Sequence, residues 1–312
     1  MSGATATTPD VSVVVAMLDE ERTIADLVER TRAALDTAGL SFEIVLVDDG
    51  SRDRTVEIAR SLEADDERVR VFEFTRNFGQ AAALACGIFA ARGNTVVQMD
   101  GDLQNPPEEI PALLAAIGDG AAIANGRRGQ RYEGFARWLG SRAIHRLARV
   151  LTGSDIDDFG GNFKAYRRDV VDAVAQVWAP GKPLFALAVW LGFPVVEVTV
   201  RHDPPFAGRS RYTLRALLRI NVDLITAFTT LPLAILGLVG LASSTLGLAG
   251  AVVVAVTPGA GWYAGAVALT LCIVGAIFIA AGVLGQYLGR VYHLAGDRPA
   301  YVVKKAPTRD SA

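Results

Sequence analysis

The feature of this sequence that most constrains its fold is a long stretch without charge. No Asp, Glu, Lys or Arg occurs between Leu224 and Gly289. Within this stretch, residues 231–256 and 262–288 are each long enough to cross a bilayer as a helix, which takes roughly 20 residues. We therefore expect a transmembrane hairpin over residues 229–289. A water-soluble helical hairpin is the alternative, and two adjacent uncharged spans disfavour it.

The charges around this stretch predict its orientation. Basic residues flank the outer ends of both spans, namely Arg215, Arg219, Arg290, Arg298, Lys304 and Lys305. Because loops rich in Lys and Arg remain on the cytosolic side of a membrane, both ends of the chain are expected in the cytosol. Residues 212–228 have an apolar stripe and charges every four residues, which is typical of an amphipathic helix in the membrane interface. An ordinary surface helix fits that pattern nearly as well.

Composition and the chain ends exclude several classes of protein. Residues 1–10 are polar and lack the apolar core of a secretory signal, so we expect a disordered, cytosolic N-terminus. Residues 290–312 are expected to form a cytosolic tail. A net charge of -2 gives no support for nucleic-acid binding. Only Cys86 and Cys272 are present, which argues against a disulfide framework.

Upstream of the apolar stretch, residues 11–211 alternate buried strands with amphipathic helices. Strands are expected at 11–15, 42–47, 69–74 and 95–99, with helices at about 21–38, between the second and third strands, and at 80–91. This alternation predicts an α/β domain with a mostly parallel sheet and helices on both faces. Ligands of such sheets bind at the carboxyl ends of the strands. The first strand is followed by no Gly-x-Gly-x-x-Gly and the chain has no Walker lysine loop, which argues against dinucleotide oxidoreductases and P-loop ATPases.

Two acidic clusters follow predicted strands. Asp100 and Asp102 are separated by one residue, and such a pair can hold a hard divalent cation against a diphosphate. A solvated acidic turn is the alternative. Asp48 and Asp49 end the second strand and could accept hydrogen bonds from a base or ribose. A turn held by their own side chains is supported equally well, because Asp-Gly-Ser favours one.

Five stretches, in the same order along the chain, resemble a known family. They are residues 47–51 (VDDGS), 76–80 (RNFGQ), 100–109 (DGDLQNPPEE), 158–168 (DFGGNFKAYRR) and 285–292 (GQYLGRVY). The chain resembles family 2 glycosyltransferases of the polyisoprenyl-phosphate type, which include the dolichyl-phosphate mannose synthases. Within that group it is most similar to bacterial undecaprenyl-phosphate 4-deoxy-4-formamido-L-arabinose transferases.

The resemblance implies a GT-A (Rossmann-like) fold, a nucleotide-diphosphate sugar donor, and Mg²⁺ or Mn²⁺ as cofactor. It also implies a polyprenyl phosphate acceptor, either undecaprenyl or decaprenyl phosphate. The implied metal ligands are Asp102 and Gln104, with Asp100 assisting. The implied nucleotide-binding residues are Glu20, Asp48, Asp49 and Asp100. A homo-oligomer is implied as well, since some relatives form tetramers.

The remaining implied site residues concern phosphates and catalysis. Arg128 and Arg131 match a family pattern whose arginines lie near phosphates, a role that suits bidentate donors. Asp158 matches a position assigned to catalysis, as a base or as an orienting group. A phosphate monoester has a second pKa of about 6, so the acceptor needs little deprotonation and orientation is the simpler role. Arg209, with Ser210 and Arg211, is expected to hold the acceptor phosphate.

We therefore expect a metal-dependent, inverting sugar transfer to polyprenyl phosphate on the cytosolic face of a bacterial plasma membrane, by a multi-pass protein of the cell envelope. A processive polysaccharide synthase is one alternative, but Gly134 stands where its Gln-x-x-Arg-Trp signature needs glutamine. A non-catalytic, sugar-nucleotide-binding membrane scaffold is another, and the acidic pair argues against it.

Overall fold

The structure is a computed structural model whose contacts divide the chain into two units. One unit comprises Met1–Arg209 and Pro299–Ala312, and the other Ser210–Arg298. The described residues are 8–128, 161–179, 182–203 and 299–307, together with single positions between 263 and 291.

The membrane segments predicted from the sequence fall almost entirely outside these residues. The interface helix expected over 212–228 lies outside them, as does most of the hairpin expected over 229–289. The described positions between 263 and 291 are helical. In the part of the chain that the structure describes, no helix is both long and apolar enough to span a bilayer.

In the first unit, eight described strands form one sheet in the order β7-β5-β6-β4-β1-β2-β3-β8. The strands are β1 (Val11–Met17), β2 (Phe42–Asp48), β3 (Val69–Phe74), β4 (Thr95–Asp100), β5 (Ile123–Arg128), β6 (Lys164–Arg167), β7 (Val195–Val200) and β8 (Val303–Lys305). The helices are α1 (Ile24–Thr37), α2 (Thr55–Asp65), α3 (Gln80–Ala90), α4 (Ile110–Gly118), α6 (Arg168–Val177) and α7 (Leu184–Trp190), with a 3-10 turn η1 (Pro107–Glu109).

The centre of the sheet is parallel, as the sequence predicts. β1 pairs in parallel with β2 and β4, and β2 with β3. The short strand β6 runs antiparallel to both β4 and β5, and β8 runs antiparallel to β3. The expectation of a mostly parallel α/β sheet is therefore confirmed. The acidic residues Asp48 and Asp100 are themselves the last residues of β2 and β4.

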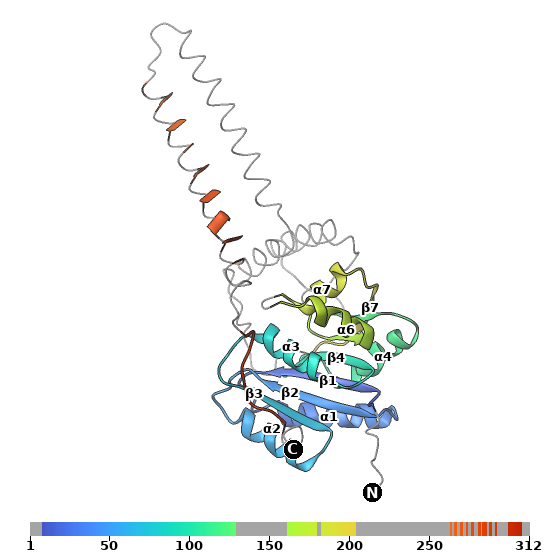
Figure 1. Cartoon of the computed structure of the whole chain (residues 1–312). Coiled ribbons are helices and arrows are strands. Elements are labelled where there is room, and N and C mark those ends of the chain that lie inside the picture. Colours follow the sequence, from blue (N-terminus) through green and yellow to red (C-terminus); the bar gives the residue numbers. More distant parts are fainter. Residues whose placement is uncertain are drawn as a thin grey trace. The chain divides into compact units, whose positions relative to one another are not determined.

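Helices cover both faces of this sheet (Figure 1), with α1 and α2 on one face and α3 and α6 on the other. The apolar stripe predicted for the first helix is its buried face, consisting of Ile24, Leu27, Val28, Thr31 and Leu35. On the opposite face α3 approaches the sheet closely. A Cβ added to Gly87 would lie 2.4 Å from a methyl of Val14, so a side chain there has no space.

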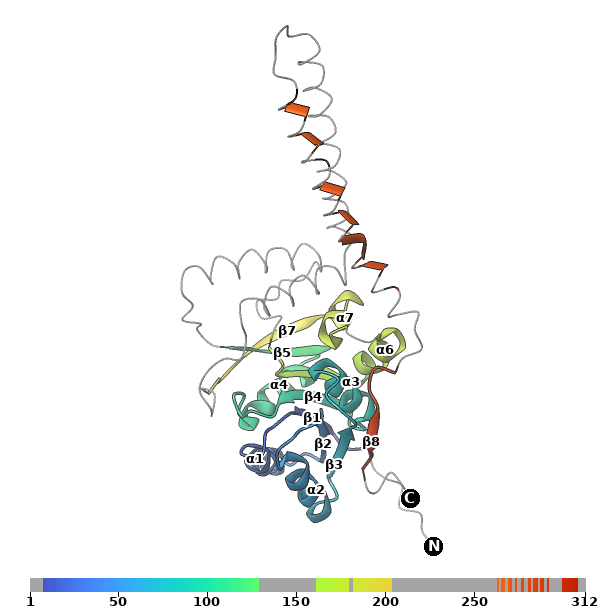
Figure 2. The same ribbon diagram turned by 90° about the vertical axis from the view of Figure 1, so that its left-hand side faces the viewer.

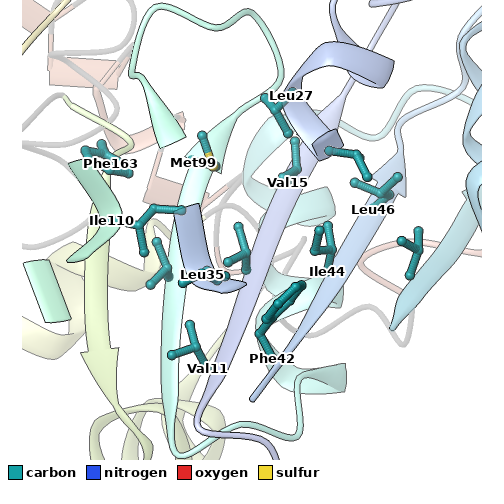
Figure 3. Packing of buried hydrophobic residues seen from close by; sticks show 14 of the residues in the cluster. Val11, Val15, Leu27, Leu35, Phe42, Ile44, Leu46, Met99, Ile110 and Phe163 are labelled. Atoms are coloured by element: carbon teal, nitrogen blue, oxygen red, sulfur yellow. The ribbon is translucent and has the colours of Figure 1, made fainter. Parts of the chain in front are cut away.

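The hydrophobic core lies between α1, α4 and the central strands. Val15, Leu46 and Met99 point into it from three neighbouring strands, and Leu27 and Ile110 close it from the helices (Figure 3). Each of these side chains is almost fully buried. Full burial of one such side chain contributes about 1.5–3 kcal/mol. This core makes a rigid base for the loops that follow the strands.

The chain returns to the sheet at its C-terminal end. β8 lies beside β3 at the edge of the sheet (Figure 2). The ring of Tyr301 stacks on that of Phe74, with centroids 5.1 Å apart. The tail expected over 290–312 thus includes a segment that is built into the first unit.

Candidate active site

The predicted metal turn follows directly from the end of β4. Oδ1 of Asp100 accepts a hydrogen bond of 2.6 Å from Nε2 of Gln80, in the first turn of α3. It also accepts one of 3.1 Å from Nδ2 of Asn162. The carboxylate of Asp102 accepts the backbone N–H of Gln104 at 3.1 Å and is also bonded to the side-chain amide of that residue. The three predicted ligands therefore lie in one turn.

The backbone of this turn is strained at Leu103, whose φ of 59° is in the left-handed region. That conformation costs a residue with a Cβ roughly 1–2 kcal/mol. Two contacts hold it in place. Leu103 packs in the core cluster, and the neighbouring Gln104 carbonyl accepts a hydrogen bond of 2.9 Å from the backbone of Asp203. Strained backbone that its surroundings enforce is characteristic of functional sites.

A series of side-chain hydrogen bonds connects Asp100 to the buried Tyr166. Tyr166 donates its hydroxyl to Gln98 at 3.1 Å, and Gln98 donates to Oδ1 of Asn162 at 3.3 Å. Burial raises the pKa of the Tyr166 phenol, so it remains a neutral donor. Asn162 in turn donates to Asp100. The direction of donation is therefore fixed along the whole series.

Asp48 holds its own turn at the end of β2. Its carboxylate accepts the backbone N–H groups of Gly50 at 3.0 Å and Ser51 at 3.1 Å, as the Asp-Gly-Ser pattern indicates. Gly50 has a φ of +82°, and a Cβ there would lie 2.7 Å from the backbone of Arg76. Only glycine fits this position. The turn therefore presses against the loop that follows β3.

Asp49 fastens that same loop. Its carboxylate accepts the backbone N–H of Phe78 at 2.6 Å and that of Gly79 at 3.0 Å, immediately before α3. Burial raises the pKa of both Asp48 and Asp49, and the backbone donors oppose the shift in each case. The carboxylates of Asp48 and Asp49 are thus both buried and bonded to backbone. Contact between these two residues and a nucleotide stays a prediction.

A cleft of about 630 Å³ opens where β1, β2 and β3 end. Its walls combine carboxylates with basic side chains and backbone from the adjoining loops. The charged residues that line it are Asp19, Asp48, Arg52, Glu73, Arg76 and Lys304. Three carboxylates and three basic side chains thus line the same cleft.

Glu20 lies on the side of the site nearest the acidic turn. Its backbone N–H donates to Oγ1 of Thr55 at 2.8 Å, and its carboxylate accepts from Thr23 at 3.1 Å. A Cβ added to Gly101 would meet Cγ of Glu20 at 3.4 Å. The described site residues therefore gather at one edge of the sheet, as predicted, and they are Glu20, Asp48, Asp49, Asp100, Asp102 and Gln104.

Other predicted site residues lie outside the described part of the chain, namely Arg131, Asp158, Arg209, Ser210 and Arg211. For Arg128 the structure describes only the backbone, at the end of β5. Conversely, sequence reasoning gave no role to Gln80 or Gln98. Gln80 could have been found because it is the last residue of the RNFGQ stretch, which is one of the five that resemble the family.

The described donor set suits a hard divalent cation. The available groups are the carboxylates of Asp100 and Asp102 and the amide oxygen of Gln104, all oxygen donors of the kind that Mg²⁺ and Mn²⁺ prefer. Among the residues that the structure describes, no three His, Cys, Asp or Glu side chains come together as a metal cluster.

The mostly parallel sheet, with an acidic turn at its carboxyl edge, defines a GT-A type glycosyltransferase fold. Residues 12–175, more than half of the chain, match the family model described as Glycosyl transferase family 2. The chain therefore belongs to glycosyltransferase family 2. It is an enzyme, a glycosyltransferase, and the resemblance found in the sequence is confirmed.

Named relatives match almost the entire chain. The undecaprenyl-phosphate 4-deoxy-4-formamido-L-arabinose transferase of Edwardsiella ictaluri is 36% identical over 302 residues, covering 94% of this chain and 93% of the relative. The protein of the same name from Pectobacterium atrosepticum is 36% identical over 307 residues, covering 95% and 93%.

A solved structure shares the fold. It is that of glucosyl-3-phosphoglycerate synthase from Mycobacterium tuberculosis in complex with Mn²⁺, uridine diphosphate and phosphoglyceric acid. Its TM-score is 0.51 at 22% identity, covering 69% of this chain and 75% of that one. At this identity the likeness supports the fold alone.

Proposed function

We propose that this enzyme transfers a sugar from a nucleotide-diphosphate sugar to polyprenyl phosphate, with inversion at the anomeric carbon. The observation that carries the proposal is the acidic turn Asp100–Asp102, held by hydrogen bonds at the carboxyl edge of the sheet, the edge at which a polar cleft also opens. Relatives that match almost the whole chain are named for transfer to undecaprenyl phosphate. Together these support both the reaction and the acceptor class.

In the proposed reaction an oxygen of the lipid phosphate attacks the anomeric carbon. The bond from that carbon to the nucleoside diphosphate breaks, and the diphosphate leaves with the electron pair. The acceptor is already mostly dianionic at neutral pH, because its second pKa is about 6, so no strong base is needed. We therefore assign Asp158 to orienting the acceptor or sugar. Arg128 and Arg131 are assigned to the phosphates.

Mg²⁺ or Mn²⁺ held by Asp100, Asp102 and Gln104 would supply neutralisation of the charge that develops on the leaving diphosphate. The role of this chain is to hold the ligands before the cation binds. The strained turn at Leu103 and the amides that donate to Asp100 provide that preorganisation. A solved structure of the same fold is a complex with Mn²⁺ and uridine diphosphate, which is consistent with this assignment.

The proposal places the reaction at the cytosolic face of a bacterial plasma membrane. The uncharged stretch of residues 229–289 would anchor the enzyme, and residues 212–228 would lie in the interface. Arg209, Ser210 and Arg211 would then meet the acceptor headgroup beside the catalytic domain. Rate would be gained mainly by proximity, because both substrates are held in one place. A homo-oligomer is part of the same proposal.

The test is transfer by the purified full-length protein in detergent, with a panel of UDP- and GDP-sugars and undecaprenyl phosphate. We expect a single glycosyl lipid by mass spectrometry, and no product from Asp102→Ala or after chelation of divalent metal. Asp119→Ala, an exposed carboxylate at the end of α4, is the matched control and should retain activity.

Each alternative predicts a different product. Long polymer in place of one glycosyl lipid would favour a processive synthase. Donor binding without turnover on any polyprenyl phosphate would favour a scaffold. Full activity of Asp102→Ala in the presence of chelator would overturn the metal assignment.

A further inference from the structure

The strand β8 brings a lysine from the far end of the chain into the cleft. Lys304 is one of the described residues that line the cleft, beside Glu73 at the end of β3. Its Nζ lies 2.5 Å from Oε1 of Glu73. The Glu73 side chain is mostly buried, at 14% exposure, whereas that of Lys304 is 62% exposed. The carboxylate is therefore the fixed partner, and the ammonium reaches into the open space.

The position of this lysine is part of the fold. The backbone N–H of Thr75 donates to the carbonyl of Val302 at 3.1 Å, and the Tyr301 ring stacks on Phe74. At the residue that follows Lys304, Arg60 donates to the carbonyl of Lys305 at 3.0 Å. The segment is thus fixed both before and after Lys304. The Lys304 side chain therefore has a fixed starting point in the wall of the cleft.

The order of strands indicates which part of the donor lies there. The acidic turn follows β4, on one side of β1, whereas β2, β3 and β8 lie on the other side. The cleft opens on that second side and is lined by Leu18 and Asp19 after β1 and by Asp48, Glu73 and Lys304. A nucleoside in this cleft would therefore lie toward β3 and β8 when its diphosphate is bound at the acidic turn.

The chemistry of the pair suits a nucleobase. An ammonium has three N–H donors, so one can bond Glu73 while others remain for a ligand. Bases such as uracil and guanine carry carbonyl oxygens on the edge that faces a protein, and lysine is a donor to such oxygens. A cation beside a fixed carboxylate is held in one orientation. Lys304 can therefore donate to a base carbonyl without a large loss of side-chain freedom.

We propose that Lys304 is a nucleotide-binding residue that donates a hydrogen bond to a base carbonyl of the donor, and that Glu73 is its positioning residue. The inference deepens the proposed function and rests on it. It also gives the C-terminal segment a role in donor recognition: the part of the chain that follows the uncharged stretch completes the cleft. Truncation or displacement of this segment would then weaken donor binding.

Isothermal titration of the full-length protein in detergent tests the inference, with UMP, UDP, GMP and GDP as ligands. Lys304→Ala is expected to raise the Kd for the monophosphate and the diphosphate of the preferred base by the same factor. That factor should be about tenfold, typical of one lost charge-assisted hydrogen bond. Lys304→Arg keeps the charge and should recover most of the affinity. The control is Lys305→Ala, which removes the same charge one residue along the strand and should bind as the wild type does.

The outcomes separate the inference from the proposed function. Wild-type affinity in Lys304→Ala overturns the inference and leaves the transfer reaction untouched. A loss confined to the diphosphates also overturns it, because the lysine would then lie at the phosphates. Equal losses in Lys304→Ala and Lys305→Ala overturn it as well, since they indicate a general effect on the strand. Wild-type protein that binds none of the four nucleotides overturns both proposals.

Discussion

At the scale of single residues, the site depends on how one carboxylate is held. Asp100 receives amide N–H groups from two elements that are distant in sequence, Gln80 in α3 and Asn162 before β6. Hydrogen bonds from two separate donors fix the orientation of a carboxylate. Asn162 accepts a hydrogen bond from Gln98, and Gln98 accepts one from Tyr166, which is buried in the sheet. The orientation of the Asp100 carboxylate is therefore set by the fold.

We predict that Asn162→Ala lowers transfer activity about 10- to 100-fold, the range seen when a residue that supports a metal ligand is removed. The concentration of Mg²⁺ or Mn²⁺ needed for half-maximal activity should rise, because Asp100 loses a donor that orients it. A metal titration of the transfer rate measures both effects. Asn94→Ala, at the opposite end of β4, is the matched control. A wild-type metal requirement in Asn162→Ala would remove this supporting role.

At the scale of elements, the parts of the fold that could be predicted are those with a local pattern. Short runs rich in apolar residues predicted β1 to β4, and spacing by three and four residues predicted the buried face of α1. β8 has only three residues, Val-Lys-Lys, and no such pattern. It is a strand because β3 offers an unpaired edge and Tyr301 stacks on Phe74. Contacts of this kind arise only once the chain has folded.

The same distinction applies to the site. Asp49 and Asp102 could be named because each stands in a short acidic motif after a strand, and Glu20 could be named through the family resemblance. That these motifs come together follows from the parallel sheet, whose strand ends share one edge. Gln98 is bonded to Asn162, and Lys304 lines the same cleft as Asp48. Both relations bring together residues that are far apart along the chain. No spacing in the sequence indicates them.

An ion pair between Arg30 and Glu108 connects α1 to η1. Arg30 donates two hydrogen bonds to Glu108, of 2.8 and 2.9 Å, and these lower the pKa of that carboxyl. A carboxyl whose pKa is lower in the folded state stabilises the protein above its unfolded pKa, which is about 4.3. That stability is lost as pH falls through the folded pKa. Because both side chains are partly exposed, the pair should contribute less than about 1 kcal/mol.

The measurement is a double-mutant cycle of Arg30→Gln and Glu108→Gln, followed by thermal unfolding from pH 7 to pH 3. The coupling between the two substitutions should be present at pH 7, shrink with added salt, and vanish once Glu108 is protonated in both states. Coupling that grows as pH falls from 7 would contradict the assignment of this stability to the ionised pair.

At the scale of the whole molecule, the proposed function assigns donor and acceptor recognition to different parts of the chain. The family model matches residues 12–175, which include every described residue of the acidic turn. The uncharged stretch and residues 209–211 lie beyond that match, yet the named relatives match about 94% of the chain. We expect recognition of the lipid acceptor to depend on residues 209–211 and the uncharged stretch, whereas residues 12–175 and the segment that carries Lys304 are expected to bind the donor.

If recognition is divided in this way, one variant should weaken binding of the acceptor without changing binding of the donor. In Arg209→Ala combined with Arg211→Ala, the KM for polyprenyl phosphate should rise about tenfold or more, because two cations that would pair with the acceptor phosphate are lost. The Kd for the nucleotide should stay unchanged, since the donor cleft is lined by other residues. Arg167→Ala, which removes an exposed arginine at the end of β6, is the control. If the double variant keeps the wild-type KM for the lipid, residues 209–211 do not hold the acceptor. If it loses donor affinity instead, donor and acceptor recognition are not divided along the chain in this way.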